Sequence, residues 1–176
     1  KILSDIDEPK GESILYCSGT CKLSDYKAPS RIEIAILKED FIDSYSKNQC
    51  YSLLSNLSLA YGPSHRFIEQ VIFHQNSALA EIIADEDFTS DNLITLHPGI
   101  SDACLQAAIL FFQKNYDSSI GGTSLFLPFA MGDLRIYRQF DVKMWGILRD
   151  LDISKCSQGL FNIGIELYNE QGELCM

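Results

Sequence analysis

The sequence has fewer basic than acidic residues and lacks a long apolar segment. Lysine and arginine number 14 against 24 aspartates and glutamates, which gives the 176 residues a formal net charge of -10. No Lys/Arg cluster offsets this charge, so we expect no nucleic acid partner, because a phosphate backbone would be repelled. No apolar run approaches the roughly 18 residues that a membrane-spanning helix needs. No signal peptide pattern is present either, and we expect a cytoplasmic protein without a membrane partner.

The sequence also lacks the motifs of common cofactor and metal sites. It contains no GxGxxG, no HExxH and no paired CxxC. Three residues separate Cys17 from Cys21, and there is no second pair and no nearby histidine, which favours two residues of a strand over metal ligands. We therefore expect no metal, and reduced thiols at several of the cysteines in apolar contexts. The six cysteines are Cys17, Cys21, Cys50, Cys104, Cys156 and Cys175.

Hydrophobic residues are abundant enough to build a sizeable core. They make up 46% of the sequence, and charged residues make up 22%, which is an ordinary globular composition. The chain opens without methionine at KILSDIDEPKGES and ends abruptly at GELCM, so we expect a piece of a longer polypeptide. We predict a single domain over residues 1–176, of which residues 1–12 are a linker.

Hydrophobic periodicity predicts two helices, and β-favouring runs between turn signals predict several strands. Apolar positions recur every three or four residues over residues 40–59, which predicts one amphipathic helix or two short ones there. Residues 99–114 have the pattern of a mostly buried helix. The strand-like segments are residues 13–23, the two halves of residues 67–84, and residues 125–139, 142–151 and 159–174. This order predicts an α+β domain in which one mostly antiparallel sheet curls around a central helix.

The central helix carries one carboxylate near its start, within the apolar stretch TLHPGISDACLQAAILFF (residues 95–112). A carboxylate beside a buried surface is costly unless it is neutralised or partnered. Asp102 and Gln106 are four residues apart and share one helix face, so the Gln106 amide could donate to the carboxyl. Burial favours the protonated acid, which can give a proton to a leaving hydroxyl. Spacing alone leaves a second interpretation open, in which Asp102 or Ser101 caps the first turn.

Three ordered motifs resemble those of dehydratase domains in modular polyketide synthases. The element HPGISDACLQ (residues 97–106) is similar to their HPxxxDxxxQ element, and YGPSH (residues 61–65) is similar to their YGPxF or YGPxH turn. The segment LFLPFAMGDLRIYR (residues 125–138) resembles the LPF strand that follows. The opening ESILYCSGTCKL (residues 12–23) resembles the strand that begins the second half of those domains. The resemblance covers roughly residues 13–173.

This resemblance implies a fold and a set of site residues. Such domains are double hotdogs, in which each hotdog is a long helix wrapped by an antiparallel sheet, and this chain would form the C-terminal half. Asp102 would protonate the β-hydroxyl of the substrate, and Gln106 would hold Asp102 or the hydroxyl. His97 would be structural, with Pro98 fixing the approach to the helix. The residues implied to bind substrate, along or near an acyl tunnel, are Tyr61, Gly62, His65, Pro128 and Phe129.

The resemblance also implies partners, but no cofactor. The substrate would be a 3-hydroxyacyl thioester on the phosphopantetheine arm of an acyl carrier protein, and other synthase domains would be neighbours. A lone hotdog leaves an apolar edge uncovered, so we expect it to pair with a first hotdog or with a second copy of this chain.

The family's catalytic base is missing from these 176 residues. It is a histidine in an HxxxGxxxxP element of the first hotdog, and none of His65, His74 and His97 fits that pattern. His65 is the best substitute by position, but a lone histidine needs an orienting partner to act as a base. We therefore predict part of a dehydratase whose base comes from a first hotdog. The alternatives are a catalytically inactive or double-bond-shifting module that binds the acyl chain or has a structural role, and a free-standing hotdog that dimerises into a thioesterase or hydratase.

Overall fold

The chain builds a five-stranded antiparallel sheet in the order β3-β4-β5-β6-β7 and a separate antiparallel pair, β1-β2. This computed structural model describes residues 2–4, 14–23, 25–39, 41–85, 96–120, 127–150 and 162–176. The strands are β1 (Ile2–Ser4), β2 (Ile14–Cys17), β3 (Asp43–Ser46), β4 (Ile68–Phe73), β5 (Ser77–Ile83), β6 (Lys143–Asp150) and β7 (Ile163–Asn169). The helices are α1 (Lys47–Asn56) and α2 (Pro98–Ile120), with short 3-10 helices η1 (Ile36–Lys38) and η2 (Pro63–His65).

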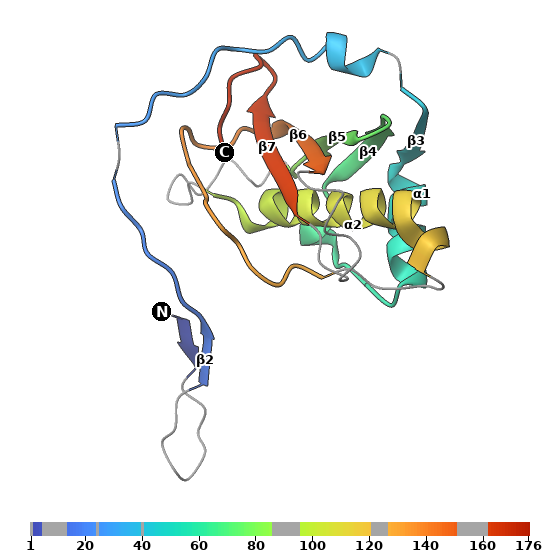
Figure 1. The fold of residues 1–176 in the computed structure, drawn as a ribbon, viewed down its shortest axis with the longest axis horizontal. Coiled ribbons are helices and arrows are strands. Elements are labelled where there is room, and N and C mark those ends of the chain that lie inside the picture. Colours follow the sequence, from blue (N-terminus) through green and yellow to red (C-terminus); the bar gives the residue numbers. More distant parts are fainter. Residues whose placement is uncertain are drawn as a thin grey trace.

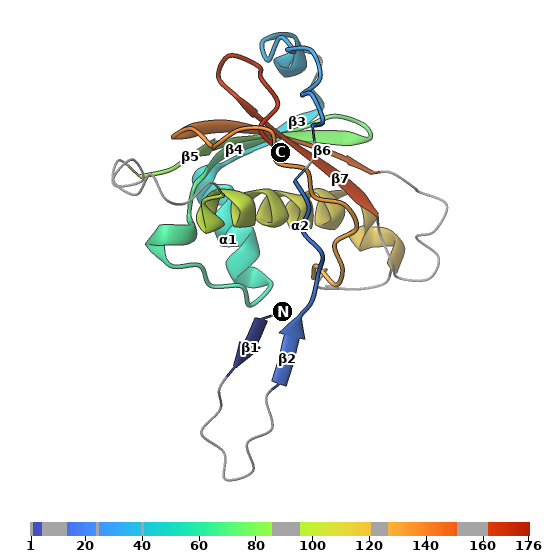
Figure 2. The ribbon, with the colours of Figure 1, turned by 90° about the vertical axis from the view of Figure 1, so that its left-hand side faces the viewer.

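Helix α2 lies across one face of the five-stranded sheet, and α1 lies on the same side (Figures 1 and 2). Small residues allow a close approach, since a Cβ on Gly146 of β6 would lie 3.0 Å from Cys104 Sγ. The prediction of an antiparallel sheet with a central, mostly buried helix is confirmed. The residues predicted to be buried on this helix are all at most 6% exposed, namely Ile100, Ala103, Cys104, Ala107, Ala108, Phe111 and Phe112.

The chain passes directly from the edge strand β3 into α1. The backbone N–H of Ser46 donates to Gln49 Oε1 at 2.9 Å, which satisfies a donor at the start of the helix. Cys50, Tyr51 and Leu54 then face inward and are at most 6% exposed. This inward face anchors α1 beside β4, close to the turn that precedes β4.

Residues 31–38, which we call the strap, cover the opposite face of the sheet (Figure 2). Ile32, Ile34 and Leu37 of the strap pack against a buried cluster that includes Trp145 of β6. Burial of such side chains stabilises the contact through the hydrophobic effect. The sheet is therefore covered on both faces, by helix α2 on one and by the strap on the other.

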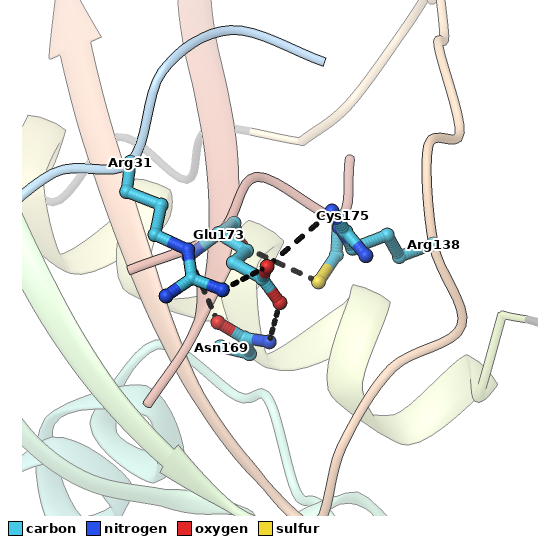
Figure 3. Close-up of polar contacts among 5 residues, drawn as sticks. All are labelled: Arg31, Arg138, Asn169, Glu173 and Cys175. Carbon is cyan, nitrogen blue, oxygen red and sulfur yellow. Dashed lines mark hydrogen bonds and ion pairs between the residues drawn. The ribbon is translucent and has the colours of Figure 1, made fainter. Parts of the chain in front are cut away.

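A polar cluster fastens the strap to the C-terminal end of the chain (Figure 3). Glu173 Oε1 accepts from Arg31 Nη2 at 2.6 Å and lies 3.4 Å from Arg138 Nη2. Asn169 Nδ2 donates to Glu173 Oε2 at 3.1 Å, and the Cys175 thiol donates to the Glu173 carbonyl at 3.5 Å. The hydrogen bond from Asn169, followed by that from Arg31, lowers the pKa of the Glu173 carboxyl. Segments far apart in the sequence are thus joined at one carboxylate.

The structure corrects two predictions about secondary structure in the middle of the chain. The spacing over residues 40–59 predicts helix throughout, but Asp43–Ser46 form strand β3 because they pair with β4. The pattern over residues 125–139 predicts a strand, but residues 127–139 contain none. Proline at position 128 lacks a backbone N–H, and so it cannot donate to a ladder there.

The structure also shortens the strand predicted near the N-terminus. The strand predicted over residues 13–23 is limited to Ile14–Cys17. Its partner is Ile2–Ser4, which lies inside the segment predicted to be a linker. This pair projects away from the five-stranded sheet (Figures 1 and 2). The sequence also predicts a polar loop over residues 85–92 and a turn over residues 150–158, and apart from residues 85 and 150 both lie outside the described residues.

Candidate active site

Helix α2 begins where the chain makes a close approach to η2. Pro98 is the first helical residue, where a missing N–H costs no intrahelical hydrogen bond. His97 Nδ1 accepts a hydrogen bond from the Gly99 N–H at 3.1 Å, in agreement with a structural role for this histidine. A Cβ at Gly99 would lie 2.5 Å from Phe67 Cε2 and 2.6 Å from the Ser64 carbonyl oxygen. The glycine therefore permits η2 to pack directly against the start of α2.

Asp102 lies beyond the first turn of α2, which contains no acidic residue. The interpretation of Asp102 or Ser101 as a helix cap is therefore wrong, because the helix already starts at Pro98. Asp102 is half-buried, and Gln106 is fully buried. The spacing places both side chains on one helix face, as the sequence predicts.

The Gln106 amide nitrogen joins Asp102 to the turn that carries YGPSH. Gln106 Nε2 donates to Asp102 Oδ2 at 2.7 Å, and the predicted hydrogen bond between these two side chains is confirmed. The same nitrogen donates to the backbone carbonyl oxygen of His65 at 2.9 Å. A backbone carbonyl accepts hydrogen bonds and never donates them. The His65 carbonyl therefore fixes which end of the Gln106 amide faces Asp102.

The oxygen of the same amide is left without a partner. Gln106 Oε1 is buried, and no donor among the described residues bonds to it. A buried acceptor without a partner typically costs about 1–3 kcal/mol. The reversed amide would place this oxygen against two acceptors, which is worse. The two bonds made by Nε2 thus determine the orientation.

Burial and the Asp102 carboxylate affect the neighbouring titratable groups. Burial, and secondly the Asp102 charge, raise the pKa of Tyr61. The same two causes raise the pKa of the Cys104 thiol to about 12. Burial, and secondly repulsion from His65, lower the pKa of His97. Tyr61 is thus close enough to Asp102 to be affected by its charge, and the Gln106 amide links Asp102 to the His65 carbonyl.

The YGPSH turn itself is held by short-range hydrogen bonds. The carbonyl of Gly62 accepts from the His65 N–H at 3.0 Å, and Ser64 Oγ lies 3.2 Å from His65 Nδ1. Beside the turn, an open hollow of about 440 Å³ lies against α1 and is lined in part by Tyr61 and Arg66. Its lining is mainly hydroxyl, amide and aromatic groups from α1 and the segment that follows it. Asp102 is not among the residues that line this hollow.

The other two predicted substrate-binding residues lie on an exposed segment of the chain. Pro128 and Phe129 belong to the segment 127–139, and Phe129 is 92% exposed. Leu127 and Met131 are also largely exposed. Within this chain, these side chains therefore do not form an enclosed tunnel wall.

Within the described part of the chain, no group of three or more His, Cys, Asp or Glu side chains has a metal-binding arrangement. No helix in those same ranges has both the length and the apolar character that crossing a membrane requires.

Sequence reasoning missed Tyr51, whose hydroxyl also contacts the YGPSH turn. Tyr51 lies on α1 and is 6% exposed. Its Oη accepts from the Ile68 N–H at 3.0 Å and donates to the His65 carbonyl at 3.5 Å. The helical periodicity gave no signal for this role, because an aromatic residue on an inward face reads as core.

The sheet and α2 form a hotdog fold, which is the fold of solved dehydratase domains of polyketide synthases. A trans-AT polyketide synthase dehydratase domain from Brevibacillus brevis superposes with a TM-score of 0.70 and 29% sequence identity, over 85% of this chain and 51% of that chain. The dehydratase domain from the CurJ module of the curacin polyketide synthase gives a TM-score of 0.70 at 22% identity, which shows the fold alone.

Sequence comparison identifies the family. Residues 35–176 match the family model described as "Polyketide synthase dehydratase N-terminal domain". The chain belongs to the polyketide synthase dehydratase family. It is 26% identical over 172 residues to polyketide synthase PksM and 28% identical over 182 residues to polyketide synthase PksL, both from Bacillus subtilis. It covers 4% of each of those synthases, and about half of the solved dehydratase domains.

Proposed function

We propose that this chain is the C-terminal hotdog of a dehydratase that removes water from a 3-hydroxyacyl thioester. The thioester is carried on the phosphopantetheine arm of an acyl carrier protein, within a synthase that supplies neighbouring domains. Asp102 is the general acid, and Gln106 holds its carboxyl group. The observation that carries the proposal is the 2.7 Å hydrogen bond from Gln106 Nε2, which orients a half-buried carboxyl on the central helix.

The proposed reaction needs one base and one acid. The base removes the proton on the α-carbon, and the C–H electron pair becomes the second bond between the α- and β-carbons. The C–O bond at the β-carbon breaks, and Asp102 gives its proton to the departing hydroxyl, which leaves as water. No cofactor takes part in this balance. The residues proposed to contact the acyl chain are Tyr61, Gly62, His65, Pro128 and Phe129.

The base is proposed to be a histidine of a first hotdog outside these 176 residues. For the CurK dehydratase, a histidine-to-phenylalanine and an aspartate-to-asparagine substitution each give an inactive mutant. That histidine precedes that aspartate by more residues than precede Asp102 here. The matching family model names an N-terminal domain. The C-terminal assignment rests instead on the order of the YGP, HPxxxDxxxQ and LPF motifs.

The test is a dehydration assay of the full-length polypeptide with a 3-hydroxyacyl carrier protein, followed by mass spectrometry of the acyl product. Asp102→Asn is expected to lower turnover by about 10²–10⁴-fold, the usual contribution of a general acid or base. Asp133→Asn is the matched control, because the Asp133 side chain is 87% exposed and pairs only loosely with Arg135 at 3.7 Å.

Three results would decide against the proposal. Undiminished water loss in Asp102→Asn would remove this residue from the acid's role. A wild-type protein that exchanges the α- and γ-protons with deuterated solvent but releases no water is a double-bond-shifting module. A protein that binds the acyl carrier protein but neither releases water nor exchanges protons has a structural or binding role.

A further inference from the structure

The carbonyl oxygen of His65 connects helix α1 to the Asp102–Gln106 pair through hydrogen bonds. This oxygen accepts from Gln106 Nε2 at 2.9 Å and from Tyr51 Oη at 3.5 Å. Both donors are buried side chains, one from α2 and one from α1. One backbone atom of the YGPSH turn thus receives a short hydrogen bond from α2 and a longer one from α1.

Tyr51 is itself held in place on three sides. Its Oη accepts from the N–H of Ile68, a residue that is fully buried at the start of β4. The Arg66 guanidinium lies 4.6 Å from the centroid of the Tyr51 ring, and the Tyr61 ring meets it edge-on at 6.5 Å. Burial raises the pKa of the Tyr51 hydroxyl, so the group keeps its proton and remains a donor to the His65 carbonyl.

We propose that Tyr51 is a positioning residue for Asp102, acting through the His65 carbonyl and the Gln106 amide. The inference rests on the proposed function, because it takes Asp102 to be the acid. A carbonyl held by Tyr51 stays within reach of Gln106 Nε2 and keeps the amide nitrogen facing Asp102. Since Asp102 Oδ2 accepts from this nitrogen, Oδ1 is the oxygen left to deliver the proton to the leaving hydroxyl.

The first measurement is the kinetics of Tyr51→Phe in the full-length polypeptide, which removes the hydroxyl and keeps the ring. We expect kcat per folded molecule to fall about tenfold, the effect of losing one hydrogen bond, with KM within about twofold of wild type. Tyr168→Phe is the matched control. Tyr168 is equally buried, but its hydroxyl contacts Glu166 at 3.3 Å within β7.

The second measurement separates positioning from a general effect on folding. In a Gln106→Met background, Tyr51→Phe is expected to cost less than about twofold in kcat, because its route to Asp102 is already cut. A side chain that only supports the core would cost the same factor in both backgrounds. Additive losses, an unchanged kcat, or a rise in KM alone would each overturn the inference.

A third variant keeps the inference testable if Tyr51→Phe does not fold, since that change also leaves the Ile68 N–H without its acceptor. Incorporation of 4-aminophenylalanine in place of Tyr51 retains a donor to the His65 carbonyl. Its kcat is expected to stay within about threefold of wild type, because the hydrogen bond is preserved. A tenfold loss here would contradict the inference.

Asp102→Asn, measured in the same series, distinguishes the two ideas. If Asp102→Asn retains turnover, the proposed function fails and the positioning of an acid fails with it. If Asp102→Asn abolishes turnover while Tyr51→Phe behaves as wild type, only the role of Tyr51 is refuted.

Discussion

Gly99→Ala is the substitution whose effect the geometry defines most closely. The added methyl group would lie 2.5 Å from Phe67 Cε2, 3.0 Å from Phe67 Cδ2 and 2.6 Å from the Ser64 carbonyl oxygen. Ordinary contacts of a Cβ begin near 3.4 Å, so the neighbours must move by almost an ångström. The Phe67 ring can turn, but the Ser64 oxygen belongs to the backbone of η2. The turn as a whole must therefore withdraw from α2.

The cost follows from two opposing effects. Overpacking typically costs about 1–3 kcal/mol, and a contact that must displace a backbone atom falls in the upper half of that range, about 2–3 kcal/mol. Alanine is the better helix former, which offsets about 1 kcal/mol. The balance is a local destabilisation of about 1–2 kcal/mol, or roughly a 5–30-fold increase in the population of opened states. Withdrawal of η2 also moves the His65 carbonyl away from Gln106, so kcat is expected to fall, as we expect for Tyr51→Phe.

Hydrogen exchange followed by mass spectrometry can measure this change in the full-length polypeptide. Peptides covering residues 61–67 and 97–106 are expected to exchange about 5–30-fold faster in Gly99→Ala, in line with the free energy above. Gly132→Ala is the control, because no atom lies within 4 Å of the Cβ position there. Exchange that is unchanged or slower at both peptides would refute the close approach of η2 to α2.

Two further predictions follow from shifted pKa values. Burial raises the pKa of the Cys50 and Cys104 thiols to about 12, so iodoacetamide at pH 8 is expected to leave both unlabelled until the protein is denatured. Labelling of the folded protein at the denatured rate would refute this. The pKa of Glu173 is lowered, so its stabilising contribution is complete above the ordinary value of 4.5 and is lost as the pH falls through the folded value. Glu173→Gln is therefore expected to accelerate hydrogen exchange in residues 25–39 near neutral pH and to match wild type in acid; a constant difference at all pH values would count against it.

The elements that sequence reasoning predicted well are those whose pattern is strong within the element itself. From Pro98 to Phe112, helix α2 is apolar or small at every position except Asp102 and Gln106, so the burial of this part follows from composition alone. The β-favouring residues on both sides of a polar turn likewise indicate the β4-β5 hairpin. The Asp102–Gln106 contact was predictable for the same local reason, since a spacing of four residues places both on one helix face.

The parts that were missed depend on partners elsewhere in the chain. Strand β3 has the sequence DSYS, which favours no strand, and it becomes one by pairing with β4. Residues 127–139 show the opposite, because a β-favouring pattern finds no ladder among the described strands. Propensity is a weak local preference, and tertiary pairing overrides it in both directions.

For the same reason, only part of the hydrogen bonding that positions Asp102 could be predicted from the sequence. Gln106 could be identified from its side chain, but its second partner is the main-chain oxygen of His65, and every residue type offers that oxygen. The sequence must instead specify the backbone path that places this oxygen beside Gln106. Gly99 leaves room for the YGPSH turn to pack against α2, and the Tyr51 hydroxyl donates to the same carbonyl oxygen. The identity of the side chain at position 65 is therefore less important for orienting the Asp102 carboxyl group than Gly99 and Tyr51, which place the carbonyl oxygen.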